Sequence, residues 1–300
     1  MKRNILLTGS NGFLGKHISF KLNGEFNLFT LSRTNSDINC DLSVFQPILP
    51  EVDIVIHSAG LAHILTQSNR KENNFFKVNV NGTKNLLQAL DELVEKPKKF
   101  IFISSVAVYG LNNGININEK HPLLANDPYG LSKIDAEKLV SEWCFKHNII
   151  CTILRLPLVV GVNPPGNLGV MINGIKRGYY FNIGGGNVKK SMVLASDVTS
   201  FILSASDVGG IYNLSDGYHP SFHELSHCIA EQIGRKNIPN LPTYIAKFLA
   251  LIGDILGEKF PINSKKLSKI TSPLTFDDSK AVNAFGWKPT KVLNGFKVYE

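Results

Sequence analysis

Tyr129 and Lys133 are the residues of this chain best suited to move a proton. They are four positions apart in the segment YGLSK, which places a phenol and an ammonium group on one face of a helix. A tyrosine is a poor base unaided because its ordinary pKa is about 10, but an adjacent cation favours the phenolate. The pattern therefore predicts an acid/base pair that exchanges protons nearer neutral pH.

A glycine-rich segment near the amino terminus could hold the reagent on which this pair acts. Residues 8–15 read TGSNGFLG, so Gly9, Gly12 and Gly15 separate a short apolar run from a helical stretch. Glycines in this pattern allow a tight turn, close approach of the backbone to a phosphate, and close packing of a helix. The helix N-terminus could then hold a pyrophosphate. We expect a bound dinucleotide, with the acid/base pair aimed at its reactive ring.

Short apolar runs alternate with helical patterns through the first half of the chain. The runs cover residues 5–7, 27–31, 54–57, 100–104 and 150–154. Strands separated by helices in this rhythm predict a parallel sheet that binds its ligands at the carboxyl ends of the strands. The glycine-rich, serine and arginine motifs stand at the carboxyl ends of these runs, where a parallel sheet binds its ligands.

The composition of the sequence changes after Pro157, where glycine-rich and proline-rich stretches replace the alternation of apolar runs and helical patterns. We expect an α/β fold, with a Rossmann-type doubly wound parallel sheet in residues 1–165. Residues 166–300 are expected to form a smaller carboxyl-terminal substrate-binding lobe. This lobe should be discontinuous, with parts of about 191–214 returning to the Rossmann core.

Composition argues against several classes of protein. The net charge is +8, from 32 basic and 24 acidic residues, but these are scattered, so we expect an anionic small-molecule ligand and no nucleic acid. The four cysteines show no CxxC spacing, which indicates neither a zinc ribbon nor a disulfide framework. The apolar stretch 244–257 contains Lys247 and Asp254 and is too short for a membrane span. Without a signal-peptide pattern either, we expect a cytoplasmic protein.

The end of the second apolar run bears on the choice of cofactor. An NAD site usually offers a carboxylate to the ribose hydroxyls at this point. Here Ser32 and Arg33 offer a hydroxyl and a guanidinium, which suit a 2′-phosphate. We therefore expect NADP, with NAD as the alternative.

Several motifs occur along the chain in a characteristic order. They are TGxxGxxG at 8–15, VNVNGT at 78–83, SSVAVYG at 104–110, YxxxK at 129–133, LRLP at 154–157, GIYNL at 210–214 and GWKP at 286–289. In these motifs the chain resembles the extended short-chain dehydrogenase/reductases, within them the NAD-dependent epimerase/dehydratase family that modifies nucleotide sugars. The resemblance runs nearly end to end and implies a UDP-sugar substrate and a homodimer.

The resemblance also implies the residues of the site. Ser105, Tyr129 and Lys133 would be catalytic: Ser105 would hydrogen-bond the reacting oxygen, and Lys133 would also hold the nicotinamide ribose. The implied cofactor contacts are Gly9, Asn11, Gly12, Phe13, Leu14, Gly15, Ser32, Arg33, Asp41, Leu42, Ser58, Ala59, Gly60, Asn79, Tyr129 and Lys133. The implied substrate contacts are Ser105, Asn167, Leu168 and Lys190. Lys190 stands where the family carries an arginine, so it offers charge to a diphosphate without the bidentate fork.

One departure from the UDP-galactose 4-epimerase pattern concerns the reaction. That pattern has an asparagine three residues after the arginine that corresponds to Arg155, whereas this chain has Leu158. The segment RLPLV is more similar to the UDP-4-keto-6-deoxy-N-acetylhexosamine 4-reductases of surface-polysaccharide synthesis. We therefore expect reduction of a C4 keto group. A 4-epimerase with tightly held NAD and a non-catalytic dinucleotide sensor remain as alternatives, although a sensor would not need all three catalytic residues.

Two groups of histidines could suggest metal binding. His223 and His227 lie in the segment HELSH, which matches the HExxH pattern of zinc hydrolases. The resemblance places that segment in a peripheral helix and supplies no third ligand, so we expect no metal. His57 at a strand end and His63 in the next loop are expected to line or support the cofactor pocket.

Overall fold

The computed structural model describes residues 2–62, 74–257, 260 and 262–299. Its centre is a seven-stranded sheet with the order β11-β7-β5-β4-β1-β2-β3. The strands are β1 (Asn4–Thr8), β2 (Asn27–Ser32), β3 (Ile38–Asn39), β4 (Ile54–His57), β5 (Lys99–Ser105), β7 (Ile150–Leu156) and β11 (Gly210–Asn213). All neighbouring strands are parallel. The expected Rossmann-type sheet is confirmed, and its strand order reverses between β1 and β4, where such sheets bind ligands.

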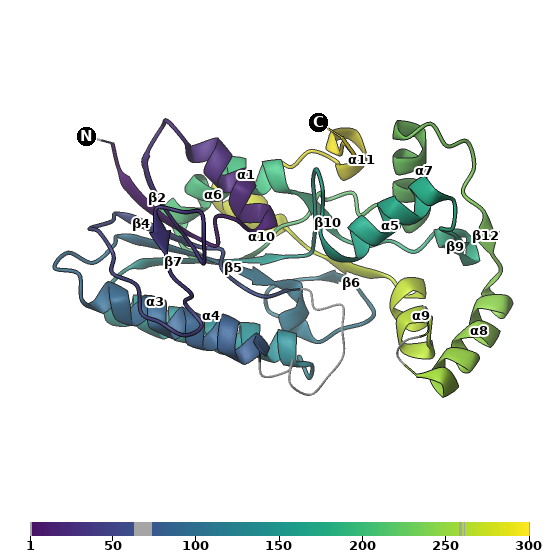
Figure 1. Ribbon diagram of the computed structural model, residues 1–300, viewed down its shortest axis with the longest axis horizontal. Coiled ribbons are helices and arrows are strands. Elements are labelled where there is room, and N and C mark those ends of the chain that lie inside the picture. The colour runs from purple at the N-terminus through teal and green to yellow at the C-terminus, as the bar shows by residue number, and fades with distance from the viewer. Residues whose placement is uncertain (1, 63–73, 258–259, 261, 300) are drawn as a thin grey trace.

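Helices cover both faces of this sheet (Figure 1). One face carries α1 (Phe13–Leu22), α6 (Ala195–Val208) and α10 (Ser279–Phe285), and the other carries α3 (Gly82–Asp91) and α4 (Pro128–Lys146). Successive side chains of a strand point to opposite faces, so Ile5 and Leu7 join the core beneath α1 and α6. Leu6 joins the opposite core beneath α3 and α4. Apolar runs without alternation are therefore buried on both faces, as parallel sheets require.

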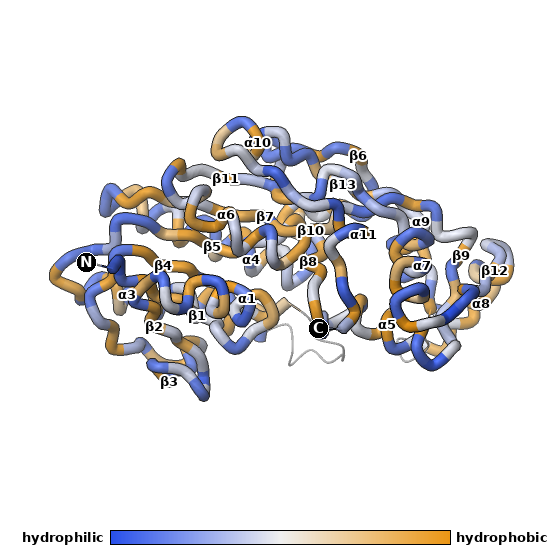
Figure 2. Tube along the Cα trace, turned by 90° about the horizontal axis from the view of Figure 1, so that it is seen from above, coloured by the Kyte–Doolittle hydropathy of each residue, from blue (hydrophilic) through white to orange (hydrophobic). Residues whose placement is uncertain are grey.

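A smaller lobe with its own core adjoins the carboxyl edge of the sheet. It contains β8 (Leu158–Val160), α5 (Gly166–Arg177), β9 (Asn182–Ile183), β10 (Met192–Leu194), α7 (Phe222–Gln232), β12 (Asn240–Leu241), α8 (Thr243–Leu256), α9 (Ser264–Thr271) and α11 (Val292–Gly295). Strand β6 (Gly114–Ile117) pairs with β13 (Leu274–Phe276). Helices α8 and α9 lie at the end of the molecule opposite β3 (Figure 2). Within the described residues, no helix is long and apolar enough to cross a membrane.

Candidate active site

Two adjoining cavities lie along the carboxyl edge of the sheet and share Gly12, Ser58, Gly60 and Leu61 in their walls. The smaller, of about 350 Å³, is lined by the candidate cofactor residues Gly9, Asn11, Gly12, Ser32, Arg33, Asp41, Leu42, Ser58, Ala59 and Gly60. The larger, of about 690 Å³, is lined by the candidates Gly12, Phe13, Leu14, Gly15, Ser58, Gly60, Ser105, Tyr129, Lys133 and Lys190. The two volumes fall in the range of small-molecule sites. The structure thus brings both halves of the candidate site together.

The glycine loop has the shape that a pyrophosphate needs. Gly9 has a φ of +72°, and a Cβ there would lie 2.6 Å from the Ala59 amide nitrogen. A Cβ on Gly15 would lie 2.1 Å from the Gly9 carbonyl oxygen, so α1 can approach the loop only with glycine at this position. The N-terminus of α1 has no side-chain cap and no acidic residue in its first turn. Its free N–H groups therefore fit the phosphates of a dinucleotide.

The end of β2 presents a guanidinium to the smaller cavity. The Ser32 hydroxyl lies 3.0 Å from the Ser10 hydroxyl and accepts a hydrogen bond from the Asn11 amide at 3.2 Å. Arg33 is exposed and lines the cavity. Asp41 lies in the same wall, but its carboxylate accepts hydrogen bonds from the Ser43 amide and hydroxyl. Arg33 is therefore the charged group at this strand end that could meet a ribose substituent.

Helix α4 carries the candidate acid/base pair. Its first turn is fixed by Pro128 and by Asp127, whose carboxylate accepts a hydrogen bond from the Gly130 amide at 3.1 Å. Tyr129 and Lys133 project from this turn and the next into the larger cavity, opposite Ser105 at the end of β5. Burial raises the pKa of Tyr129, while a hydrogen bond with the Ser105 side chain acts in the opposite direction. The expected shift of the Tyr129 pKa toward neutral pH is therefore wrong, because burial outweighs the hydrogen bond and Lys133 is not among the causes of the shift. A phenol that keeps its proton is able to donate it.

Lys133 is itself buried, with its ammonium group 2.9 Å from the Ile103 carbonyl oxygen and 4.8 Å from the centre of the Phe102 ring. Burial lowers its pKa to about 8, although the nearby Glu137 carboxylate acts to raise it. A Cβ on Gly60 would lie 3.2 Å from the Lys133 ammonium nitrogen. The glycine therefore leaves the ammonium open toward the cofactor side of the cavity.

A chain of buried hydrogen bonds ties the cofactor loop to α4. Asn79 accepts a hydrogen bond from the Leu61 amide at 2.7 Å and donates one to the Ser132 hydroxyl at 2.9 Å. Among the described residues that line the two cavities, Asn79 is absent. Its hydrogen bonds instead fix the loop after β4 against the helix that carries Tyr129. It lies in η1 (Phe76–Asn81), a π-helical turn. Such turns are frequent at functional sites.

His57 belongs to the same network of buried hydrogen bonds. Thr83 donates its hydroxyl proton to the Asn79 carbonyl oxygen, so it accepts from His57 Nε2 at 2.9 Å. His57 Nδ1 then accepts from the Thr8 hydroxyl at 2.6 Å. Burial lowers the pKa of His57 to about 3, and the ring is neutral. The expected supporting role has a physical basis, whereas His63 lies outside the described residues.

The candidate substrate residues occupy different environments. Lys190 lines the larger cavity, and burial, with a further contribution from Lys269, lowers its pKa to about 8. Asn167 is exposed at the start of α5, and Leu168 is buried in the lobe core. Neither is among the described residues that line the two cavities.

Two lysines that sequence reasoning missed also face the larger cavity. Lys265 and Lys269 lie one turn apart on α9 and join Lys190 in the cavity wall. Their i, i+4 spacing was a signal for a shared helix face, but only the tertiary fold brings that face to the cavity. Three lysines around one end of the cavity favour an anionic group such as a diphosphate.

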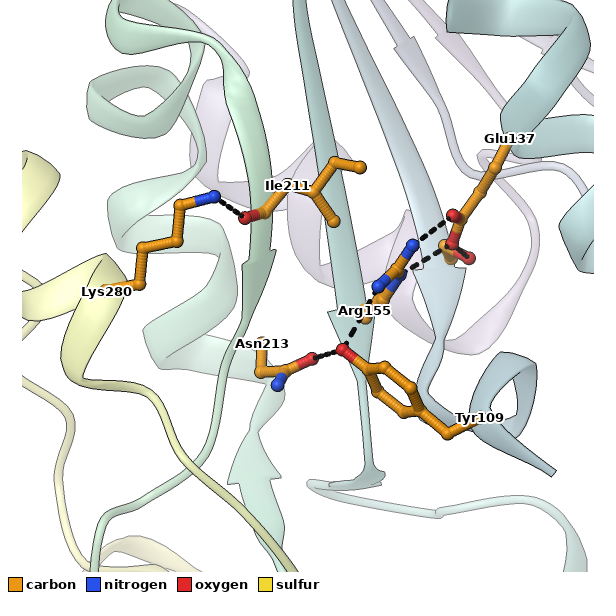
Figure 3. A network of polar contacts seen from close by, with 7 residues as sticks. Tyr109, Glu137, Arg155, Ile211, Asn213 and Lys280 are labelled. Carbon is orange, nitrogen blue, oxygen red and sulfur yellow. Dashed lines mark hydrogen bonds and ion pairs between the residues drawn. The ribbon is translucent and has the colours of Figure 1, made fainter. Parts of the chain in front are cut away.

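A buried ion pair joins Glu137 of α4, one turn after the candidate catalytic Lys133, to Arg155 of β7 (Figure 3). Two guanidinium nitrogens donate to the carboxylate at 2.7 and 3.1 Å, and a third donates to the Tyr109 hydroxyl at 3.1 Å. Tyr109 in turn donates to the Asn213 side chain at 2.7 Å. Burial disfavours the charge of Arg155, but the contacts with Glu137 outweigh it and raise the pKa of Arg155. Because Glu137 follows Lys133 by one turn, the pair holds α4 against β5 and β7.

The HELSH segment has a structural explanation. Glu224 completes a capping box with Ser221 at the start of α7, and its second oxygen accepts a hydrogen bond from Tyr218. The rings of His223 and His227 lie 4.3 Å apart, and the described part of the chain contains no cluster of three or more metal-ligating side chains. The glutamate that a zinc hydrolase would use as its base is therefore engaged in the helix cap.

Chelation by EDTA is expected to leave the activity of the protein unchanged, because His223 and His227 lack a third ligand in the described structure. Metal analysis of the purified protein and an assay after EDTA treatment check this. Stoichiometric zinc that disappears in His223→Ala together with activity would show the prediction to be wrong.

Comparisons with known proteins agree with this geometry. A family model described as the NAD dependent epimerase/dehydratase family matches residues 5–215. The chain is 28% identical over 300 residues to N-acetyl-alpha-D-glucosaminyl-diphospho-ditrans,octacis-undecaprenol 4-epimerase of Escherichia coli O157:H7, covering 93% of this chain and 89% of the relative. It is 28% identical over 251 residues to GDP-6-deoxy-D-mannose reductase of Pseudomonas aeruginosa, covering 77% and 80%. The solved structure of UDP-glucose 4-epimerase from Thermotoga maritima with UDP-glucose has the same fold, with a TM-score of 0.76, 22% identity, and coverage of 97% and 96%.

Proposed function

The chain belongs to the NAD dependent epimerase/dehydratase family, and we propose that it reduces the C4 keto group of a UDP-linked 4-keto-6-deoxy-N-acetylhexosamine. The observation that carries this proposal is that Tyr129, Lys133 and Ser105 line a cavity that adjoins the smaller cavity at the glycine loop. Family membership makes the protein an NAD(P)-binding enzyme of nucleotide-sugar epimerase and reductase type. Arg33 and Leu158 favour reduction with NADPH.

The proposed mechanism is a proton transfer coupled to hydride transfer. Bound NADPH would supply the hydride to the C4 carbon, which converts the carbonyl oxygen into a developing alkoxide. Ser105 would hold that oxygen by a hydrogen bond, and Tyr129 would donate its phenolic proton to it. Lys133 would stabilise the phenolate that remains. One hydride and one proton are added across the C=O bond, which gives a 4-hydroxy sugar and NADP⁺.

The diphosphate of the substrate would lie among Lys190, Lys265 and Lys269. These side chains supply positive charge at one end of the larger cavity, with Leu158 also in its wall. Lysines offer point charges without the bidentate geometry of arginine, so this end of the cavity would recognise charge more than orientation. Asn167 and Leu168 remain proposed substrate contacts.

A cytoplasmic homodimer remains our prediction for the location and assembly of the protein.

A 4-epimerase is the second candidate function. The Escherichia coli relative is named as a 4-epimerase, and the same three catalytic groups can remove hydride from C4 and return it to the opposite face. Such an enzyme would keep NAD tightly bound. Its substrate would be a UDP-hexose, a UDP-N-acetylhexosamine or, as in the name of that relative, an undecaprenol-linked sugar.

Cofactor stoichiometry separates these two reactions. With UDP-4-keto-6-deoxy-N-acetylglucosamine, a reductase consumes one NADPH per sugar, which the loss of absorbance at the reduced-nicotinamide band measures. We expect this substrate to oxidise NADPH quickly, and UDP-N-acetylglucosamine or UDP-glucose to epimerise slowly or not at all. Rapid epimerisation of either hexose without added cofactor, together with NAD retained in native mass spectrometry, would reverse the assignment.

Arg33→Ala is expected to weaken NADP binding much more than NAD binding. A charge-assisted hydrogen bond from the guanidinium to a 2′-phosphate would contribute about 1.5 to 3 kcal/mol, which corresponds to roughly a ten- to hundredfold change in affinity. Calorimetry with both cofactors measures the difference. Arg177→Ala, which removes an exposed cation on α5, serves as the control and should change neither affinity. Equal losses for both cofactors in Arg33→Ala would refute the NADP preference.

The kcat/KM of the reduction is expected to fall as the pH rises above about 8, where Lys133 loses its proton. A lysine is charged below its pKa and neutral above it, so the phenolate left by Tyr129 would lose its stabilising cation at high pH. A profile of kcat/KM for the sugar from pH 6 to pH 10, at saturating NADPH, tests this assignment. A flat profile across this range would contradict it.

A further inference from the structure

Helix α8 has its polarity reversed relative to an ordinary surface helix. Its large side chains Tyr244, Phe248, Leu251 and Ile255 are 74, 64, 61 and 85% exposed. They follow a spacing of four, three and four residues, so they share one face of the helix. The exposed face of α8 is therefore a continuous apolar stripe.

The buried face of α8 carries small residues instead. Ala246 and Ala250 are buried in a small core with Leu267 of α9. A Cβ on Gly253 would lie 1.9 Å from the Ile262 carbonyl oxygen, so the backbone of α8 packs directly against the segment that leads into α9. The helix cannot rotate to bury its large side chains without placing them in this contact. The apolar stripe is thus a fixed part of the fold.

The segment that carries the apolar stripe has a positive net charge. Residues 235–270 contain seven Lys and Arg and two Asp and Glu, which gives this segment five of the eight net positive charges of the chain. Lys247 is exposed on α8 beside the stripe, whereas Lys265 and Lys269 of α9 line the larger cavity. Asp254 of α8 accepts hydrogen bonds from the Ser264 amide and hydroxyl and so fixes the neighbouring helix. The surroundings of the stripe are complementary to an anionic surface.

We propose that α8 docks on the surface of an anionic phospholipid bilayer. The stripe would lie at the level of the acyl-chain boundary, and Lys247 beside it would contact a lipid phosphate. The position of α8 at the end of the molecule leaves it free to meet a flat surface (Figures 1 and 2). A second copy of the chain fits less well, because a symmetric contact through this face would bring two segments of positive net charge together. This docking does not depend on the reaction that the site catalyses.

Cosedimentation with lipid vesicles tests the proposal without substrate. We expect the protein to bind vesicles of phosphatidylethanolamine and phosphatidylglycerol, and to bind phosphatidylcholine vesicles about fivefold more weakly, because a lysine near an anionic surface adds about 1 kcal/mol. The double variant Phe248→Glu, Leu251→Glu should lose at least about tenfold in binding to anionic vesicles, since it places two carboxylates in the apolar stripe. Phe145→Glu on α4, at a side chain that is 89% exposed, is the matched control and should bind as the original protein does.

Circular dichroism and NADP affinity establish that the double variant is folded, since α8 does not line either cavity. Absence of binding to anionic vesicles would overturn the proposal, as would equal binding to phosphatidylcholine vesicles. An equal loss in Phe145→Glu would overturn it as well. Light scattering addresses the second-copy alternative: a dimer that the double variant converts into monomers, with vesicle binding unchanged, would assign the stripe to self-association and refute membrane docking.

Discussion

Tyr129→Phe is expected to lower turnover by about a hundredfold or more, with little change in cofactor affinity. The substitution keeps the ring and removes the hydroxyl that would give its proton to the sugar oxygen, and general acid/base groups contribute on the order of a hundred- to ten-thousandfold. Tyr129 and Ser105 line the larger cavity, whereas Gly9, Asn11 and Arg33 line the smaller one. Steady-state kinetics with a verified sugar nucleotide, together with calorimetry of NADPH binding, measure the two effects separately.

Two further variants sharpen this test. Tyr179→Phe, which removes an exposed hydroxyl outside both cavities, should leave kcat unchanged. Lys133→Ala should reduce both turnover and cofactor affinity, because the ammonium group would serve the phenolate and the ribose together. Near-normal turnover in Tyr129→Phe would show that another group is the acid.

Glu137→Ala is expected to destabilise the protein by about 3 to 5 kcal/mol, because it leaves the Arg155 guanidinium buried without its ionic partner. Both side chains are almost fully buried, at 5 and 3% exposure, and the carboxylate also accepts a hydrogen bond from the Ser104 hydroxyl at 2.5 Å. Urea unfolding followed by circular dichroism measures the change in the free energy of unfolding. The loss of the carboxylate should also move the alkaline fall of the kcat/KM profile to lower pH, since Glu137 acts to raise the pKa of Lys133.

Glu142→Ala on the same helix is the matched control. Glu142 is 64% exposed and lies 3.9 Å from the Lys138 ammonium, so its removal should cost less than about 1 kcal/mol. A similar small effect in Glu137→Ala would mean that water or a rearranged side chain compensates Arg155, and the ion pair would then not hold α4 in place.

The parts of the fold that depend on local patterns could be predicted from the sequence. The apolar run at 54–57 has the same bounds as β4. The other four runs fall within β1, β2, β5 and β7, and each strand extends one or two residues beyond its run. Strand β3 has only two residues, too few to show a hydrophobic pattern. The glycine loop and the Tyr129-Lys133 spacing were equally visible because all their residues lie within one or two helical turns.

Contacts between distant segments could not be predicted in the same way. Lys265 and Lys269 face the larger cavity only through the tertiary fold, since they follow Tyr129 by 136 and 140 residues along the chain. The ion pair of Glu137 and Arg155 joins a helix and a strand whose sequences show no pairing signal. Sequence patterns report periodicity within an element, whereas these contacts depend on how elements pack.

Transfer of deuterium from labelled cofactor to the sugar tests the central claim most directly. The protein would be incubated with UDP-4-keto-6-deoxy-N-acetylglucosamine and NADPH that carries deuterium at both C4 positions of the nicotinamide ring. The account predicts one deuterium in each product molecule, located at C4 of the sugar by nuclear magnetic resonance, and a transfer at least about a hundredfold slower in Tyr129→Phe. Deuterium at another carbon, or a reduced product without deuterium, would contradict the assignment of this site to hydride transfer at C4.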